Sequence, residues 1–285
     1  MKNVFAFFKA VLALFLSFFM AMSSAGFPRV PHAKDFELVW ADEFDGTAFD
    51  TAKWAGLYCN DDTENPAIRR GSYWHTDMAT VKDGSLHIRT EYYPEGYKGN
   101  GKPGWYSCGL FTKGLFEQKY GYFEVRCILP KGSGMWSAFW LTCDGMKHVD
   151  GGGTDGAEID VMEAPYYGKR LNQKIASNIH YDGYEEAHKS KRACEPYLLF
   201  NNPYEEFNTY GLEWNENEYI FYVNGIKTGR STFGGASQAA EYLLLSVEVG
   251  GDDAVPGDSW AGDAIAKDSH PTDFVVDYVR VYQYK

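Results

Sequence analysis

The sequence predicts an all-β protein built as a β-sandwich of antiparallel sheets. From position 36 onward, short runs of alternating apolar and polar residues are separated by turn residues, and helical periodicity is almost absent. The chain also contains no internal repeat and no linker, and its length suits one all-β domain. If one sheet is curved, its concave face would be open to a long ligand.

The first 25 residues have the pattern of an export signal and are excluded from the fold. Lys2 and Lys9 flank the start, Ala10–Met22 is apolar with one serine, and small residues follow at a plausible cleavage point. The apolar run is shorter than the ~20 residues of a membrane span. We therefore expect residues 26–285 to form a single domain, secreted or periplasmic, without stable membrane insertion. An uncleaved anchor is the alternative.

The first half of this domain contains six expected strands. The polar turn at 42–46 ends the first of them, and the Asp83-Gly84 dipeptide between two alternating runs predicts a hairpin. The expected strands are Phe36–Trp40, Ala79–Val81, Leu86–Thr90, Tyr106–Thr112, Gly121–Leu129 and Met135–Cys143.

The second half begins with an acidic strand at Glu158–Glu163 and continues in the same way. Asp182 to Arg192 is expected to be a polar loop, Asn224-Gly225 a tight turn, and Gly250 to Pro271 a loop rich in Gly, Asp and Pro. The other expected strands are Ile175–Tyr181, Phe207–Trp214, Tyr219–Val223, Glu241–Val249 and Phe274–Tyr284.

The charge excludes some partners. Removing the signal takes away two lysines, so the formal charge of the remaining chain is 25 − 39 = −14. Such an acidic protein is not expected to bind nucleic acid or anionic membranes. We expect a monomer.

Five cysteines remain after export, and the odd number leaves at least one thiol unpaired. No spacing typical of a metal site is present among them. Buried free cysteines are the expectation, with a Cys108–Cys127 disulfide as the alternative if their strands are neighbours.

The acidic strand carries Glu158, Asp160 and Glu163. Side chains alternate along a strand, so the first two share a face and the third falls one residue late. A single β-bulge would return Glu163 to the face of the other two. The two glutamates would then lie roughly 13 Å apart at Cα, and long side chains could bring their carboxyls to the ~5–5.5 Å of a retaining glycosidase. A solvated acidic edge strand is the alternative.

The motif Glu158-Ile-Asp160-Val-Met-Glu163 resembles that of glycoside hydrolase family 16, in its bulged, laminarinase-like branch. Further similar segments occur in the same order along the chain. They are Trp40–Gly46, Lys119–Arg126, Leu129–Gly132, Trp136–Leu141, Tyr210–Trp214 and Val276–Tyr282.

The resemblance implies a lectin-like jelly roll with an open concave cleft and endo-acting hydrolysis with retention. It implies that Glu158 is the nucleophile, Glu163 the general acid and base, and Asp160 a residue that holds Glu158. The residues agree with this division, because three crowded carboxyls cannot all ionise cheaply and at least one pKa should rise. A raised pKa suits a proton donor near neutral pH.

Aromatic residues and one histidine are candidates for sugar contacts. Trp136 and Trp140 share a strand face, and Trp214 and His180 resemble family cleft residues; core packing is the alternative for each tryptophan and a structural bond for the histidine. Trp74 and Trp260 lie in expected loops that could border the cleft.

No cofactor is expected in catalysis. The resemblance implies a structural calcium ion held by Glu43, the Gly84 carbonyl and Asp277, and oxygen ligands suit calcium. An ordinary surface acid is the alternative for each carboxylate.

The expected protein is therefore a secreted retaining endo-β-glucanase acting on β-1,3- or mixed β-1,3-1,4-glucan. The segment 245–254 lacks the usual laminarinase loop sequence, which leaves the substrate open. The alternatives are a galactan hydrolase of the agarase or carrageenase kind, a transglycosylase, and a non-catalytic lectin-like glucan-binding protein.

Overall fold

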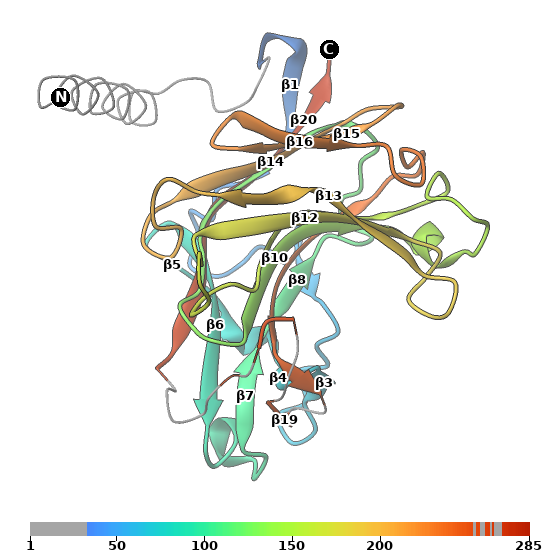
Figure 1. Cartoon of the computed structure of the whole chain (residues 1–285). Coiled ribbons are helices and arrows are strands. Elements are labelled where there is room, and N and C mark those ends of the chain that lie inside the picture. The colour runs from blue at the N-terminus through green and yellow to red at the C-terminus, as the bar shows by residue number, and fades with distance from the viewer. Residues whose placement is uncertain (1–32, 253–254, 257–259, 263, 265–269) are drawn as a thin grey trace, which may run out of the picture.

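Two large β-sheets stack against each other in the computed structural model, which describes residues 33–252, 255–256, 260–262, 264 and 270–285. Figure 1 shows the strands of the two layers running side by side with strong twist. The described helical segments are single 3₁₀ turns: η1 (Ala33–Asp35), η2 (Thr76–Met78), η3 (Tyr97–Gly99) and η4 (Asp144–Lys147). The all-β prediction is confirmed.

The larger sheet has eleven strands. Their order is β16 (Ile226–Ser231), β15 (Tyr219–Val223), β14 (Asn208–Trp214), β9 (Gly121–Ile128), β20 (Thr272–Tyr284), β6 (Ser85–Tyr93), β7 (Gly104–Ser107), β4 (Ser72–Trp74) and β3 (Ala67–Arg69), with β1 (Phe36–Asp42) paired to β20 and β5 (Ala79–Lys82) paired to β6.

The second sheet has seven strands and carries the acidic motif. Their order is β13 (Lys189–Leu198), β12 (Lys174–Tyr181), β11 (Glu158–Ala164), β10 (Met135–Thr142), β17 (Tyr242–Val249), β8 (Gly109–Phe111) and β2 (Ala55–Gly56). A separate two-stranded ribbon joins β18 (Gly251–Asp252) and β19 (Val255–Pro256).

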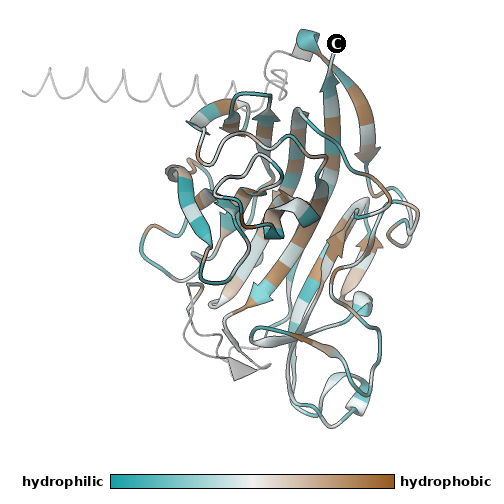
Figure 2. Cartoon of the chain, turned by 90° about the vertical axis from the view of Figure 1, so that its right-hand side faces the viewer, coloured by the Kyte–Doolittle hydropathy of each residue, from teal (hydrophilic) through white to brown (hydrophobic). Residues whose placement is uncertain are grey.

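The main core lies between the two sheets, where alternate residues of facing strands pack together. Phe123 and Val125 of β9 are fully buried in it, as are Phe139 of β10 and Ile159 of β11. Figure 2 shows the corresponding bands of hydrophobic and hydrophilic residues along the strands. This alternation leaves the other side of the seven-stranded sheet, here called the outer face, available for polar side chains.

Both predicted hairpin dipeptides form tight turns. Asp83 and Gly84 have φ of 53° and 71° between β5 and β6, and Asn224 and Gly225 have φ of 51° and 75° between β15 and β16. Two successive residues in the left-handed region are what a two-residue hairpin needs, and Asp, Asn and Gly tolerate it best.

One predicted loop is partly wrong. Asp182 to Arg192 was expected to be irregular, but β13 begins at Lys189 and pairs with β12, with Tyr181 opposite Lys189. Lys189, Lys191 and Arg192 are exposed on this edge strand. Charged residues are common on edge strands because they prevent pairing with another chain, and they hide the strand from a hydrophobic pattern.

The Cys108–Cys127 pairing is also wrong. Cys59, Cys108, Cys127 and Cys143 are free thiols, and Cys108 lies beside Cys59 with 3.9 Å between the sulfur atoms. Cys127 is buried in the main core, where burial raises its pKa well above the usual value.

Two predictions concern parts of the chain outside the described residues: the signal at residues 1–25 and any pairing of the Cys194 side chain. No helix among the residues described is long and apolar enough to cross a bilayer.

Candidate active site

The three acids of β11 come together on the outer face because the strand is bulged. Asp160 pairs with Asn178 of β12, whereas Glu163 pairs with Ala176, so three steps along β11 match two along β12. The pairing with β10 shifts at the same point. Glu158, Asp160 and Glu163 therefore project from one face, and the predicted bulge is confirmed.

Glu163 is 5% exposed and held by two donors. The indole Nε1 of Trp136 donates to its Oε1 at 2.8 Å, and the amide of Asn178 donates to its Oε2. Burial raises the pKa of Glu163 well above the usual range, the nearby charge of Asp160 adds to the rise, and the Asn178 hydrogen bond opposes it. Glu163 is therefore suited to hold a proton at neutral pH.

Glu158 is more accessible and sits beside different groups. The hydroxyl of Tyr184 donates to its Oε2, and Nε2 of His180 lies 3.9 Å from its Oε1. Burial raises the pKa of Glu158, but the charge of His180 and the hydrogen bond from Tyr184 both lower it. The two glutamates thus differ in environment as a nucleophile and an acid must.

Asp160 lies between the two glutamates and is almost fully buried. Its Oδ2 is 3.1 Å from Nε2 of His180. Burial raises its pKa well above the usual range, and the charge of Glu158 raises it further. Asp160 and Glu163 also share a hydrogen bond, so the cluster titrates as a coupled set.

His180 connects the acids to a second histidine. Its Nδ1 lies 2.9 Å from Nε2 of His188, and the two rings are nearly coplanar at 8°. Among the described residues, Glu158, Asp160 and His180 have ligand atoms within 4.8 Å of one another. We assign no ion there, because the close contact of His180 Nε2 with Asp160 Oδ2 and its position near Glu158 already explain why the three groups lie together.

Trp136 and Trp260 are the predicted sugar-contact tryptophans that lie near the acids. Trp136 is half-buried, and Trp260, which is 40% exposed, meets it edge-on with ring centroids 5.0 Å apart. The guanidinium of Arg70 lies 5.1 Å from the Trp136 ring. Stacking of Trp136 on a sugar ring stays a prediction. Arg70 already contacts the Trp136 ring.

The other three predicted tryptophans are buried and cannot act as exposed stacking platforms. Trp214 is fully buried in the main core and donates to the carbonyl of Ser237 at 3.2 Å. Trp74 and Trp140 pack with Leu244 in a small apolar cluster, at 0% and 8% exposure. Their rings pack in apolar clusters, which was the alternative interpretation for each tryptophan expected on a strand.

This difference in burial predicts opposite effects of truncation. Trp214→Ala should lower the free energy of unfolding by about 3–5 kcal/mol, because it empties a large core volume. Trp260→Ala should lower the free energy of unfolding by no more than about 1 kcal/mol, because the side chain is 40% exposed and lies outside the main core. Urea denaturation of both variants measures this. An equal loss of unfolding free energy in the two variants would contradict the buried position of Trp214 or the exposed position of Trp260.

Several site residues were not predicted. Asn178 carries no motif of its own in the sequence, and Tyr184 falls within an expected polar loop with no motif. No sequence signal indicated the group formed by Arg69, Arg70 and Glu248. The end of β3 and the residue after it meet β17 from a distant position in the chain.

Two arginines share one carboxylate at the outer face. Arg69 donates to Oε1 of Glu248 at 2.7 Å, and Arg70 donates to Oε2 of the same residue. Two guanidinium groups share one carboxylate, so these three side chains together carry one positive charge beside the acid cluster. An anionic group on a ligand would find partners here.

The predicted calcium ligands lie around one place on β20 but are already paired. Val276 pairs with Leu86 and Val279 with Asp42, which brings the β5–β6 turn and the end of β1 to the same part of β20. Glu43, however, receives two hydrogen bonds from Arg280 at 2.7 and 2.8 Å, and Asp277 is bonded to Arg126. These arginines already balance both carboxylates, so the residues fit a cation poorly; calcium binding stays a prediction.

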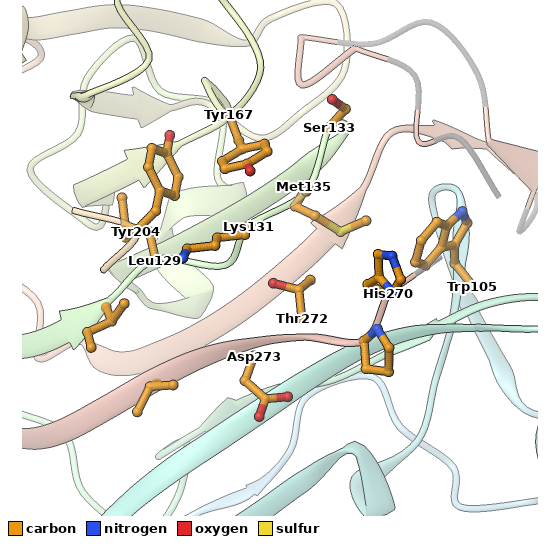
Figure 3. Close-up of a pocket in the computed structure, with 14 residues that line it drawn as sticks. Trp105, Leu129, Lys131, Ser133, Met135, Tyr167, Tyr204, His270, Thr272 and Asp273 are labelled. Carbon is orange, nitrogen blue, oxygen red and sulfur yellow. The ribbon is translucent and has the colours of Figure 1, made fainter. Parts of the chain in front are cut away.

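A hollow of about 570 Å³ opens between the sheets, away from the acids. Met135, Trp105 and His270 line it (Figure 3). Met135 is buried in the main core, whereas its neighbour Trp136 contacts Glu163 on the outer face. The hollow and the acids are therefore on opposite sides of β10.

A buried glutamate supports the start of the motif. Glu241 is fully buried and accepts a hydrogen bond from the amide of Ala157 at 3.2 Å. Burial raises its pKa to about 8.

This pKa predicts a specific pH dependence. Between pH ~4.5 and 8 the folded state keeps a proton on Glu241 that the unfolded chain has lost, so this group lowers stability as pH rises. Glu241→Gln, which keeps the acceptor oxygen, should raise the free energy of unfolding at pH 8 by on the order of a few kcal/mol relative to wild type, and by almost nothing at pH 4. Denaturant titrations at both values test it. A gain that is equal at the two values would contradict the buried carboxyl.

The whole chain from β1 to β20 is similar to one family of carbohydrate-active domains. A family model described as the glycoside hydrolase family 16 domain of β-porphyranases A–D matches residues 38–284. The chain is 27% identical over 285 residues to a β-glucanase of Rhodothermus marinus, with 95% of this chain and 94% of the relative covered. It is 28% identical to glucan endo-1,3-β-glucosidase A1 of Niallia circulans, covering 91% of this chain but only 40% of that longer protein.

Solved structures show the same fold. The laminarinase catalytic domain of Thermotoga maritima superposes with a TM-score of 0.66 at 27% identity, covering 88% of this chain and 99% of that one. SCLam, a non-specific endo-β-1,3(4)-glucanase, gives a TM-score of 0.67 at 29% identity, covering 90% and 93%. A mutant of SCLam holds 1,3-β-D-cellobiosyl-glucose at its active site.

Proposed function

The chain belongs to glycoside hydrolase family 16, and we propose that it cleaves a β-linked polysaccharide internally with retention of configuration. The observation that carries this proposal is the asymmetry of the carboxyl pair on β11. Burial raises the pKa of Glu163 well above the usual range, whereas His180 and Tyr184 both lower the pKa of Glu158 and so oppose the effect of its burial. Such a pair provides the acid and the nucleophile of double displacement.

The reaction proceeds in two balanced steps. A carboxylate oxygen of Glu158 attacks the anomeric carbon, the glycosidic C–O bond breaks, and Glu163 gives its proton to the departing oxygen. Water then attacks the same carbon while Glu163 takes its proton, and the ester bond to Glu158 breaks with the electron pair returning to the carboxylate. Trp136 and Asn178 hold the Glu163 carboxyl in place through both steps.

A β-1,3- or mixed β-1,3-1,4-glucan is the first candidate substrate. Its support is the activity for which the relatives are named, among them the Rhodothermus marinus β-glucanase that aligns along nearly its whole length. The half-exposed aromatic pair of Trp136 and Trp260 beside the acids suits the apolar faces of sugar rings.

A sulfated galactan such as porphyran is the second candidate, favoured by two specific observations. The matching family model is described as that of β-porphyranases. Arg69 and Arg70 also carry one positive charge more than Glu248 balances, and Arg70 lies next to Trp136, where a neutral glucan has no group to pair with it. The net negative charge of the chain opposes such a polymer at long range, but the local pair would act at contact.

One experiment tests the reaction and separates the substrates. Purified protein is incubated with laminarin, barley β-glucan, lichenan, agarose, porphyran and xyloglucan, and released reducing ends and oligosaccharides are measured. We expect oligosaccharides from one class only, with the β-anomer formed first by NMR. Initial formation of the α-anomer would contradict retention, and the absence of products from every polymer would favour a non-catalytic binding protein.

Export and a monomeric state belong to the same proposal. A polysaccharide is too large to enter a cell intact, so an enzyme with this substrate works outside the cytoplasm, as the apolar N-terminal segment predicts.

A further inference from the structure

We propose that Tyr184 is a positioning residue of this reaction, which orients the Glu158 carboxylate for attack and supports it again when the glycosyl ester breaks. The proposal rests on the proposed function, because it takes Glu158 as the nucleophile. The residue lies outside the acidic strand, in the segment 182–188 that joins β12 to β13.

The contact is a direct one between the phenol and the nucleophile. The hydroxyl of Tyr184 donates to Oε2 of Glu158, and within the described part of the chain it is the one hydrogen-bond donor on that carboxylate. Oε1 faces Nε2 of His180 at 3.9 Å, too far for a hydrogen bond. The orientation of the carboxyl plane therefore depends on Tyr184.

The segment that carries Tyr184 is fixed at both ends. Asp182, which is 3% exposed, has φ of 63° and accepts amide hydrogens from residues 150–151 at 3.2 and 3.1 Å. The amide of Gly183 donates to the carbonyl of Met146 at 2.7 Å. The left-handed residue turns the chain back over the outer face, so the next side chain reaches the acids.

The far end is tied to the acid cluster itself. His188 donates its amide hydrogen to the carbonyl of Glu185 at 3.0 Å, and its ring lies 2.9 Å from His180. The ring of Tyr184 lies 5.9 Å from that of His188. Although Tyr184 is 52% exposed, its position is therefore determined by packing and hydrogen bonds on both sides.

Tyr184 differs in kind from the other groups around Glu158. Those groups are titratable or charged, and none of them donates a hydrogen bond to this carboxylate in the described part of the chain. They are Asp160 and Glu163 from β11, His180 from β12, Glu248 from β17, Glu241 just before β17, and Arg69 from β3. A hydrogen bond to the ionised form favours that form, so removing the hydroxyl raises the pKa of Glu158.

The same bond acts in both chemical steps. Before attack it keeps the carboxylate ionised and aligned. When water breaks the ester, the negative charge returns to Glu158 and the hydroxyl stabilises it as the leaving group. Loss of the hydroxyl should therefore slow breakdown of the covalent intermediate, in addition to changing the pH at which attack begins.

Tyr184→Phe tests this with the polysaccharide that the wild type cleaves. We expect kcat to fall about tenfold, in line with the loss of one hydrogen bond to a charged group. The acid limb of the kcat/KM profile should move upward by about one pH unit. KM should fall together with kcat if the intermediate accumulates, which a loss of folding or of simple substrate contact would not produce.

Two further variants separate the hydroxyl from the ring. Tyr284→Phe removes a hydroxyl that donates to Glu213 at 3.2 Å on the other sheet, and it should leave the pH profile unchanged. Tyr184→Ala removes ring and hydroxyl together. If Tyr184→Phe keeps the wild-type acid limb and rate while Tyr184→Ala loses activity, the ring alone matters and the proposal is overturned.

A readout without substrate keeps this test apart from the proposed function. Water-soluble carbodiimide labels protonated carboxyls, and peptide mass spectrometry gives the pH midpoint of labelling at Glu158. The midpoint should be higher in Tyr184→Phe than in wild type, whichever polysaccharide is cleaved. An unchanged midpoint sinks the positioning role, whereas an inactive wild type with a shifted midpoint sinks only the proposed reaction.

Discussion

Replacing Glu158 by alanine should reduce polysaccharide hydrolysis by at least about 10⁴-fold, because the proposed mechanism needs its carboxylate to form the covalent intermediate. Sodium azide should restore turnover of an aryl β-glycoside by entering the space of the missing carboxyl. It would attack from that side and give a glycosyl azide of inverted, α configuration. Product NMR identifies this compound, and its formation would assign the side of the sugar on which Glu158 acts.

The fold should survive this substitution. The pKa of Glu158 is raised by burial, so its charge is a cost to the folded state, and Glu158→Gln should leave the free energy of unfolding equal or higher. Glu213→Gln, on the opposite sheet, is a matched control that should keep full activity. A folded Glu158→Gln protein with wild-type activity would remove Glu158 from the mechanism.

Replacing Glu163 by alanine should lower kcat on polysaccharide by about 10²–10⁴-fold. The loss should be much smaller for formation of the intermediate from a dinitrophenyl glycoside, whose leaving group needs no proton. Comparing burst rates for the two kinds of leaving group measures the contribution of the proton donor. Azide should again accelerate turnover, but here it replaces water on the intermediate and gives the β-glycosyl azide.

The pH profile provides a second test of Glu163. Its pKa lies well above the usual range, so wild-type kcat/KM should fall on the basic side as this proton is lost. Glu163→Ala should lack that basic limb while keeping the acid limb. An equal loss of rate for both leaving groups, with the basic limb intact, would instead indicate that Glu163 only supports the strand.

Local pattern was enough to predict most strands and the acid cluster. Strand alternation depends only on residues that are neighbours in the chain. The three-residue spacing from Asp160 to Glu163 breaks that alternation, and this break indicates a bulge. The turns at Asp83-Gly84 and Asn224-Gly225 follow from the conformations that these residues tolerate.

The tryptophans show where this reasoning ends. Alternation separates two faces of a strand, but it does not tell which face is covered when both carry aromatic rings. Trp214 and Trp136 both lie on alternating strands, yet the first is fully buried and the second contacts Glu163. Only the stacking of the two sheets decides between them.

The unpredicted site residues come from segments whose position depends on tertiary structure. Tyr184 reaches Glu158 because Asp182 turns the chain back. Arg70, the residue after β3, bonds to Glu248 of β17, and this bond holds it next to Trp136. No short sequence pattern predicts such side-chain contacts, because the two residues are far apart in the chain or lie in irregular backbone.

The bulge in β11 also determines where this chain can change in length. Strand side chains repeat every two residues, so one residue added between Ile159 and Asp160 would carry Glu158 to the core side and bring Ile159 out toward water. One residue added in the glycine-rich stretch at 151–153 lies outside the strand and would leave the alternation of β11 unchanged. In this chain, the number of residues along β11 therefore determines which side chains face the acid cluster.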